Sequence, residues 1–165
     1  MKSILVIIAI TLSTVSLRAQ VAPAPDFESL EDVIKLIPRD VIKDLKQPSK
    51  IETARRTAND VLQNGVVNKT VTFELELGER SAWAGGENTT DKIQVATKDM
   101  PVDIGGLDFI VRLWVMMPQD QEAVLDKQRP GAEVKVTGKL TRFAFTAASG
   151  KLFLDGDLRQ SRLDP

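Results

Sequence analysis

Cysteine and histidine are both absent from the 165 residues of this chain. A disulfide, a thiol nucleophile, a Ser-His-Asp triad and a His/Cys metal site are therefore excluded within one chain. No lipid can be attached to an N-terminal cysteine either. An exported domain without disulfides must be held together by its apolar core, which fits a Gram-negative periplasm at least as well as a harsher extracellular setting.

The first 19 residues have the pattern of a secretory signal peptide. Lys2 supplies a positive charge, Ile4 to Ile10 is an unbroken apolar run, and Ala19 is the expected last residue removed. A signal anchor is the alternative, but the apolar run is shorter than the roughly 20 residues that span a bilayer, which favours cleavage. We therefore expect an exported protein, periplasmic or secreted, that is soluble after cleavage and has no membrane span.

Positive charge and aromatic side chains are both scarce. Loss of residues 1–19 removes Lys2 and Arg18 but no acid, so the formal net charge falls from −1 to −3. Nucleic-acid affinity comes mostly from Lys and Arg that neutralise phosphates, and single strands also stack on aromatic side chains. Because no aromatic series lies on a basic strip, the composition disfavours nucleic acid as a partner.

Residues 20–65 are predicted to form an N-terminal helical extension. After a Pro/Ala-rich lead, apolar residues recur at spacings of three and four, which is typical of one buried helical face. Proline lacks an amide donor and clashes with the preceding turn, so Pro38 predicts two short helices, about 27–36 and 39–46. A third helix is expected from about residue 49 to Gly65, with a capping box formed by Ser49 and Glu52.

After Gly65 the period of the apolar residues changes from 3.6 to 2, which indicates strands. Five strands are predicted, at residues 71–77, 92–98, 107–117, from 130 to about 145, and 151–158. The segments between them are expected to form a polar loop at 78–91, a turn at 99–106 and one or two helical turns within 118–128. Residues 161–165 are expected to be a tail.

The fourth predicted strand contains two signs of curvature. Phe143 and Phe145 are out of register with Leu140 and the apolar residues before it, which predicts a bulge near residues 141–142. Gly138, in the middle of the strand, would permit the tight bend of a small barrel.

The order of three strands, a short helical connection and two strands resembles an OB-fold over about residues 66–160. The segments PGAEVKVTGKL at 130–140 and KLFLDGDL at 151–158 are similar to the fourth and fifth strands of small exported bacterial OB domains of the tRNA-anticodon-binding type. The resemblance implies a mostly β, α+β fold: a five-stranded OB-like barrel with two or three N-terminal helices. Another small barrel, or a sandwich with the helices on one face, fits the element order nearly as well.

OB-folds usually bind ligands across their second and third strands, between two framing loops. The resemblance therefore implies a ligand-binding groove built from five candidate residues, Arg80, Trp83, Arg112, Trp114 and Lys151. For Trp114 we favour a packing role beneath the N-terminal helices, because its neighbours Ile110 and Met116 are apolar. Trp83 lies among small and polar residues, where an exposed aromatic and a packed one are equally expected.

These features together favour a non-catalytic binding or interaction module for a protein or a small polar ligand. We expect no catalytic residue, no metal site and no cofactor. Asp155 and Asp157 are the densest acidic pair, but the further acids of a calcium loop are missing, which favours a turn or a solvated strand face. A hydrolase that uses two carboxylates is the alternative, and a nucleic-acid-binding OB domain is the second alternative.

Overall fold

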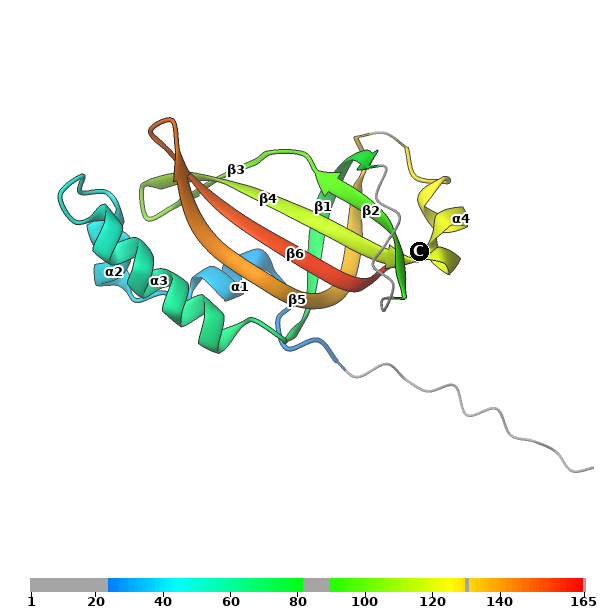
Figure 1. Ribbon diagram of the computed structural model, residues 1–165, viewed down its shortest axis with the longest axis horizontal. Helices are drawn as coiled ribbons and strands as arrows, with labels where there is room; N and C mark the ends of the chain where they lie inside the picture. The colour runs from blue at the N-terminus through cyan, green and yellow to red at the C-terminus, as the bar shows by residue number, and fades with distance from the viewer. Residues whose placement is uncertain (1–23, 82–89, 130, 165) are drawn as a thin grey trace, which may run out of the picture.

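The computed structural model describes residues 24–81, 90–129 and 131–164 (Figure 1). The predicted signal peptide at 1–19 lies outside the described residues. In chain order the elements are α1 (Leu30–Ile34), α2 (Arg39–Leu45), α3 (Ile51–Gly65), β1 (Thr70–Ser81), β2 (Asp91–Thr97), β3 (Met100–Ile104), β4 (Leu107–Pro118), the 3₁₀ turn η1 (Gln119–Gln121), α4 (Glu122–Leu125), β5 (Glu133–Ala148) and β6 (Lys151–Leu163). The prediction of a mostly β fold with N-terminal helices is confirmed.

All six strands belong to one sheet in the order β2-β1-β5-β6-β4-β3, and β2 also pairs with β4. The pairs are antiparallel except for β4 with β6, which are parallel. One edge of β4 pairs with β6, while its other edge pairs first with β3 and then with β2. The pairings therefore run in a circuit from β1 through β2, β4, β6 and β5 back to β1, and β3 is attached at the side.

Helices α2 and α3 lie at one end of the sheet, α1 lies nearer its middle, toward β1, and α4 lies at the other end (Figure 1). One apolar core joins residues of α1 to α3 with alternate residues of the strands. Within it, the rings of Phe109 and Phe145 meet edge to face at 5.4 Å. No helix among the described residues is long and apolar enough to cross a membrane.

The predicted turn at 99–106 is wrong, because residues 100–104 form the sixth strand, β3. The turn itself is only Gly105 and Gly106, whose φ angles of 60° and 74° suit glycine. Pro101 is tolerated because β3 pairs with β4 alone among the described strands, and an edge strand loses little when one residue lacks an amide donor.

Two predicted strand ends are also wrong. β1 continues to Ser81, into the predicted loop 78–91, because it pairs with β2 as far as Gln94. β6 continues through the predicted tail 161–165 as far as Leu163, which pairs with Val136 and is only 5% exposed. In both places the strand continues beyond its alternating apolar residues because it pairs with another strand.

The predicted bulge in β5 is confirmed. The register between β5 and β6 shifts between Leu140 and Arg142, and a second shift falls between Thr137 and Lys139. A Cβ atom on Gly138 would lie 2.5 Å from Ser161 Oγ, so glycine here allows β5 and β6 to approach closely.

The helices are broken at Pro38 as predicted, with Pro38 as the N-cap of α2. The capping box at Ser49 and Glu52 is wrong: the N-cap of α3 is Lys50, with no side-chain cap. The amides of Lys50 and Ile51 instead donate to the carbonyl oxygen of Gln47, both at 2.9 Å, so a side-chain acceptor is not needed.

Helix α3 is attached to β5 through one asparagine. Asn59 Nδ2 donates to the carbonyl oxygen of Phe145 at 3.1 Å, and the Phe145 amide donates to Asn59 Oδ1 at 2.6 Å. β1 pairs with β5 only as far as Lys139. Beyond that residue, Asn59 supplies hydrogen-bond partners for the β5 backbone in place of β1. The helix buries Ala54, Ala58 and Leu62 on the same side.

Candidate functional site

Four charged side chains form a ladder on the outer face of β4, β6 and β5, which we call the Arg–Asp ladder: Arg112, Asp155, Asp157 and Arg142. The register aligns Arg112 of β4 with Asp155 of β6, and Arg142 of β5 with Asp157 of β6. Residues two apart on a strand face the same side, so the two acids of β6 lie between the arginines of its neighbours.

Arg112 is held on two sides. Its Nε donates to Asp155 Oδ1 at 2.8 Å, and its guanidinium carbon lies 3.9 Å from the centre of the Phe153 ring, a cation–π contact. The hydrogen bond to Asp155 raises the pKa of Arg112, against the opposing effect of desolvation. Neither Nη group donates a hydrogen bond to another described residue.

Asp155 is mostly covered, with 16% of its side chain exposed. Besides the bond from Arg112, its Oδ2 accepts a hydrogen bond from Thr146 Oγ1 at 2.5 Å. Burial by itself would raise the pKa of Asp155, but the bonds from Arg112 and Thr146 and the charge of Arg142 outweigh it and lower that pKa below its ordinary value. The carboxylate therefore stays ionised at neutral pH.

Arg142 and Asp157 form a two-point ion pair. Arg142 Nε donates to Asp157 Oδ2 and its Nη2 donates to Oδ1, both at 2.9 Å. This parallel geometry is the strong form of an arginine–carboxylate contact. It raises the pKa of Arg142, again with the hydrogen bond as the largest cause.

Trp114 stands on the same outer face, two residues after Arg112, and is 40% exposed. Its partners in the register are Ala96 of β2 and Asp157 of β6. The predicted packing of Trp114 beneath the N-terminal helices is therefore wrong. Its backbone position on β4 directs it away from the core, whereas α1 to α3 pack on the core side with Leu113 and Val115.

Beside this tryptophan is a hollow of about 380 Å³, which we call the Trp114 hollow. Its walls come from β2 and β4, with contributions from β5, β6 and the β2–β3 connection: Ala96, Thr97, Asp99, Arg112, Leu113, Trp114, Arg142 and Asp155. An exposed aromatic side chain, an arginine and an ionised acid thus meet in one place.

Of the four predicted site residues that the structure describes, it brings together Arg112 and Trp114. Arg80 does not line the Trp114 hollow; its Nη2 donates to Glu122 Oε1 of α4 at 2.6 Å. Lys151 is exposed at the β5–β6 hairpin and lines a different hollow. Trp83 lies outside the described residues.

Sequence reasoning missed the partners that hold the site together. Asp155 and Asp157 were interpreted only as a turn or a solvated strand face, and Arg142 only as the position of a bulge. The spacing of Phe153, Asp155 and Asp157 shows that they share one face of β6. Which arginines they meet depends on the register across the bulge, which the local pattern does not specify.

Comparison with known proteins adds no relative. No protein-family model, no curated protein and no solved structure matches this chain. Within the described parts of the chain, no group of three or more acidic side chains is arranged to hold a metal ion.

Proposed function

We propose that this chain is an exported, non-catalytic binding module whose protein partner contacts the outer face of β4 and β6 at Trp114. The observation that carries the proposal is the 40% exposed Trp114 beside Arg112 at the edge of a hollow. Tryptophan and arginine are the residues that most often dominate binding energy at protein interfaces. The guanidinium N–H groups of Arg112 that do not bond to Asp155 suit backbone or side-chain oxygen atoms of the partner.

The strand circuit supports an OB-like barrel as the frame of this site, with β3 as an added hairpin strand. In that assignment β2 and β4 are the second and third barrel strands, across which OB-folds bind their ligands. The Trp114 hollow is lined by residues of these two strands, Ala96 and Thr97 from β2 and Leu113 from β4 among them. The apolar leader at residues 1–19 supports export.

The alternative of a carboxylate hydrolase is less well supported. A general acid in a glycosidase needs a raised pKa, but the pKa of Asp155 is lowered. Asp157 is occupied by the two-point contact with Arg142. Loss of turnover on changing either acid to its amide would be the evidence that revives this alternative.

Nucleic-acid binding is also less well supported. The two arginines of the ladder are matched by two aspartates, so little positive charge remains for phosphates. If nucleic acid were the partner, its affinity would fall steeply with added salt. Flat salt dependence, or no binding, is what the present proposal expects.

The test compares two large apolar side chains with the same exposure. Trp114→Ala should reduce capture of the partner from a periplasmic extract by about 10-fold or more, as expected for an interface anchor. Leu36→Ala is the matched control, because Leu36 is also 40% exposed but belongs to the turn after α1. It should leave capture unchanged.

Thermal unfolding of the same variants separates binding from folding. Trp114→Ala should unfold within a few degrees of the parent, because an exposed side chain contributes little to the core. The proposal fails if Trp114→Ala captures the partner normally, or if it loses capture only by unfolding.

A further inference from the structure

A second surface feature lies away from the Trp114 hollow, between the first two helices and β3. It is a hollow of about 1040 Å³, which we call the helix–β3 hollow. Its walls are mainly apolar: Leu30, Ile34, Ile37, Ile42, Val102 and Ile104. A volume of this size is at the upper end of the range of small-molecule sites, about 300–1,000 Å³.

The hollow exists because the helical layer touches the β3–β4 hairpin without filling the space beside it. Nζ of Lys46, the C-cap of α2, donates to the carbonyl oxygen of Gly105 in the hairpin turn. A second hollow of about 750 Å³ includes Lys46 in its wall and shares Val102 and Asp103 with the first. The shared residues make the two hollows neighbours along β3.

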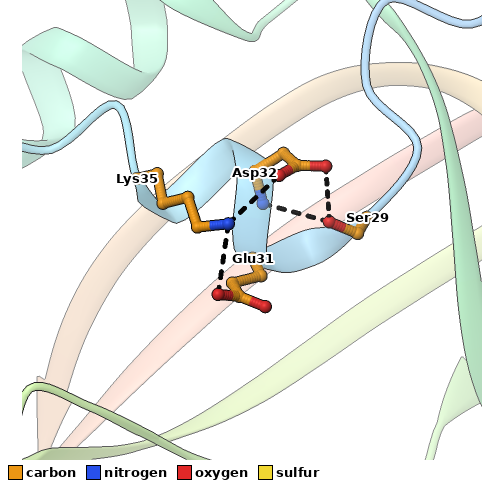
Figure 2. Close-up of polar contacts among 4 residues, drawn as sticks. All are labelled: Ser29, Glu31, Asp32 and Lys35. Atoms are coloured by element: carbon orange, nitrogen blue, oxygen red, sulfur yellow. Dashed lines mark hydrogen bonds and ion pairs between the residues drawn. The ribbon is translucent and has the colours of Figure 1, made fainter.

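Five charged side chains line the helix–β3 hollow, the basic Lys35, Arg39 and Lys43 and the acidic Glu31 and Asp103. Lys35 is already engaged: its Nζ lies 3.2 Å from Glu31 Oε1 and 3.4 Å from Asp32 Oδ1, as Figure 2 shows. These contacts raise the pKa of Lys35, with the hydrogen bond to Glu31 as the largest cause. Asp32 is in turn held by the N-cap Ser29, whose Oγ accepts the Asp32 amide at 3.1 Å (Figure 2).

Arg39 and Lys43 are the rim cations that remain available. Both line the hollow, and neither side chain makes a hydrogen bond or ion pair with another described residue. They are four residues apart on α2, where like charges share one face and repel. Asp103, also at the rim, is turned to its own hairpin, where its Oδ1 accepts the Gly106 amide at 2.9 Å. An anion placed between Arg39 and Lys43 would relieve their repulsion.

We propose that the helix–β3 hollow binds a long-chain fatty acid, with its carboxylate at Arg39 and Lys43 and its chain along the half-buried Leu30, Val102 and Ile104. A single acyl chain suits a hollow with mainly apolar walls, and arginine gives a carboxylate two parallel hydrogen bonds. This goes beyond the proposed protein-binding function and uses a different face of the molecule.

Addition of a peptide strand to the free edge of β3 is the competing occupant, and the edge disfavours it. Pro101 lacks the amide donor that a new ladder needs, and the carbonyl oxygen of Gly105 is occupied by Lys46. The fatty acid needs neither group.

The test measures fluorescence of cis-parinaric acid, below its critical micelle concentration, with the full chain. Saturable binding should be displaced by palmitate but at least about 10-fold less well by methyl palmitate, which has the same chain without the charge. The double variant Arg39→Glu/Lys43→Glu should bind cis-parinaric acid at least about 10-fold more weakly than the parent.

Matched controls identify the cause of any loss. Arg56→Glu/Lys127→Glu makes the same charge change at two exposed side chains outside the hollow and should bind like the parent. Ile104→Trp should fill the hollow and abolish binding, with the far-ultraviolet circular dichroism spectrum retained. Trp114→Ala should bind the fatty acid normally, so failure here and failure of the proposed function are separate results.

Three outcomes would overturn the proposal: no saturable binding by the parent, equal displacement by palmitate and its methyl ester, or equal binding by the Arg39/Lys43 and Arg56/Lys127 double variants. Equal effects in the two double variants would show a response to net charge only.

Discussion

At the scale of single residues, buried or half-buried carboxylates position the strands that frame the candidate site. Asp91, at the start of β2, is almost fully buried, and its Oδ1 accepts the backbone amide of Gln160 at 3.0 Å. Gln160 has a φ of 52°, a conformation that a side chain rarely adopts without local support. The bond therefore joins the first residue of β2 to a distorted position in β6.

Asp155 gives a prediction for the pH dependence of stability. Its pKa is lowered in the folded state, so the unfolded state binds more protons as the pH falls through about 4. The stabilisation from Arg112 and Thr146 is therefore present above the ordinary aspartate pKa and is lost as the pH falls through the lower, folded-state pKa. Urea denaturation between pH 7 and pH 2 should show the parent losing more stability than Asp155→Asn in this acid range.

The control for this experiment is Asp108→Asn. Asp108 is at an exposed position of β4, and its side chain makes no hydrogen bond or ion pair with another described residue. Its acid profile should follow that of the parent. Parallel profiles for the parent and Asp155→Asn would contradict the assignment of the stabilised carboxylate to Asp155.

At the scale of elements, the attachment of α3 to β5 depends on Asn59. Its side chain both donates to and accepts from the backbone of Phe145, as a neighbouring strand would. The amphipathic pattern of α3 predicts which face is buried, but β5 has to end its pairing with β1 before this face has a partner.

Asn59→Ala should therefore lower the free energy of unfolding by about 1–3 kcal/mol, because two backbone groups of Phe145 lose their partners. Hydrogen exchange of the Phe145 amide should become faster in the same variant. Asn64→Ala is the control, since the exposed Asn64 bonds only within its own helix, to the Asp60 carbonyl oxygen. Normal protection of Phe145 in Asn59→Ala would show that the docking does not depend on this side chain.

At the scale of the whole molecule, the strand circuit requires a close approach between β6 and its two neighbours. Gly156 is buried, and a Cβ atom there would lie 2.6 Å from Phe143 Cδ2 and 2.9 Å from Leu113 Cδ2. Phe143 is in β5 and Leu113 is in β4, so both neighbours crowd this position. A side chain at residue 156 would push the strands apart.

Gly156→Ala should accordingly destabilise the fold by about 1–3 kcal/mol, as overpacking of a core does. The same substitution at Gly65 should be neutral or slightly stabilising, because alanine favours helix and the nearby atom, Leu36 Cδ1 at 3.3 Å, belongs to an exposed side chain. Chemical denaturation of both variants measures the contrast. Equal effects at the two positions would mean that β6 has room for a side chain.

The local sequence was enough to predict features that depend on neighbours in the chain. The helical period, the break at Pro38, the strand period after Gly65 and the bulge near residues 141–142 all follow from spacing and backbone chemistry. For this reason the main elements were predicted close to their observed positions.

Tertiary structure decided the features that depend on which strands meet. Residues 100–104 become a strand because β4 offers them an edge, and β1 and β6 extend as far as their partners do. Trp114 remains exposed because the helices pack elsewhere, and Arg112 meets Asp155 through a parallel pairing of strands about 40 residues apart. Local periodicity specifies which face of a strand is apolar, whereas the side chains that meet across strands are specified by register, a property of the whole sheet.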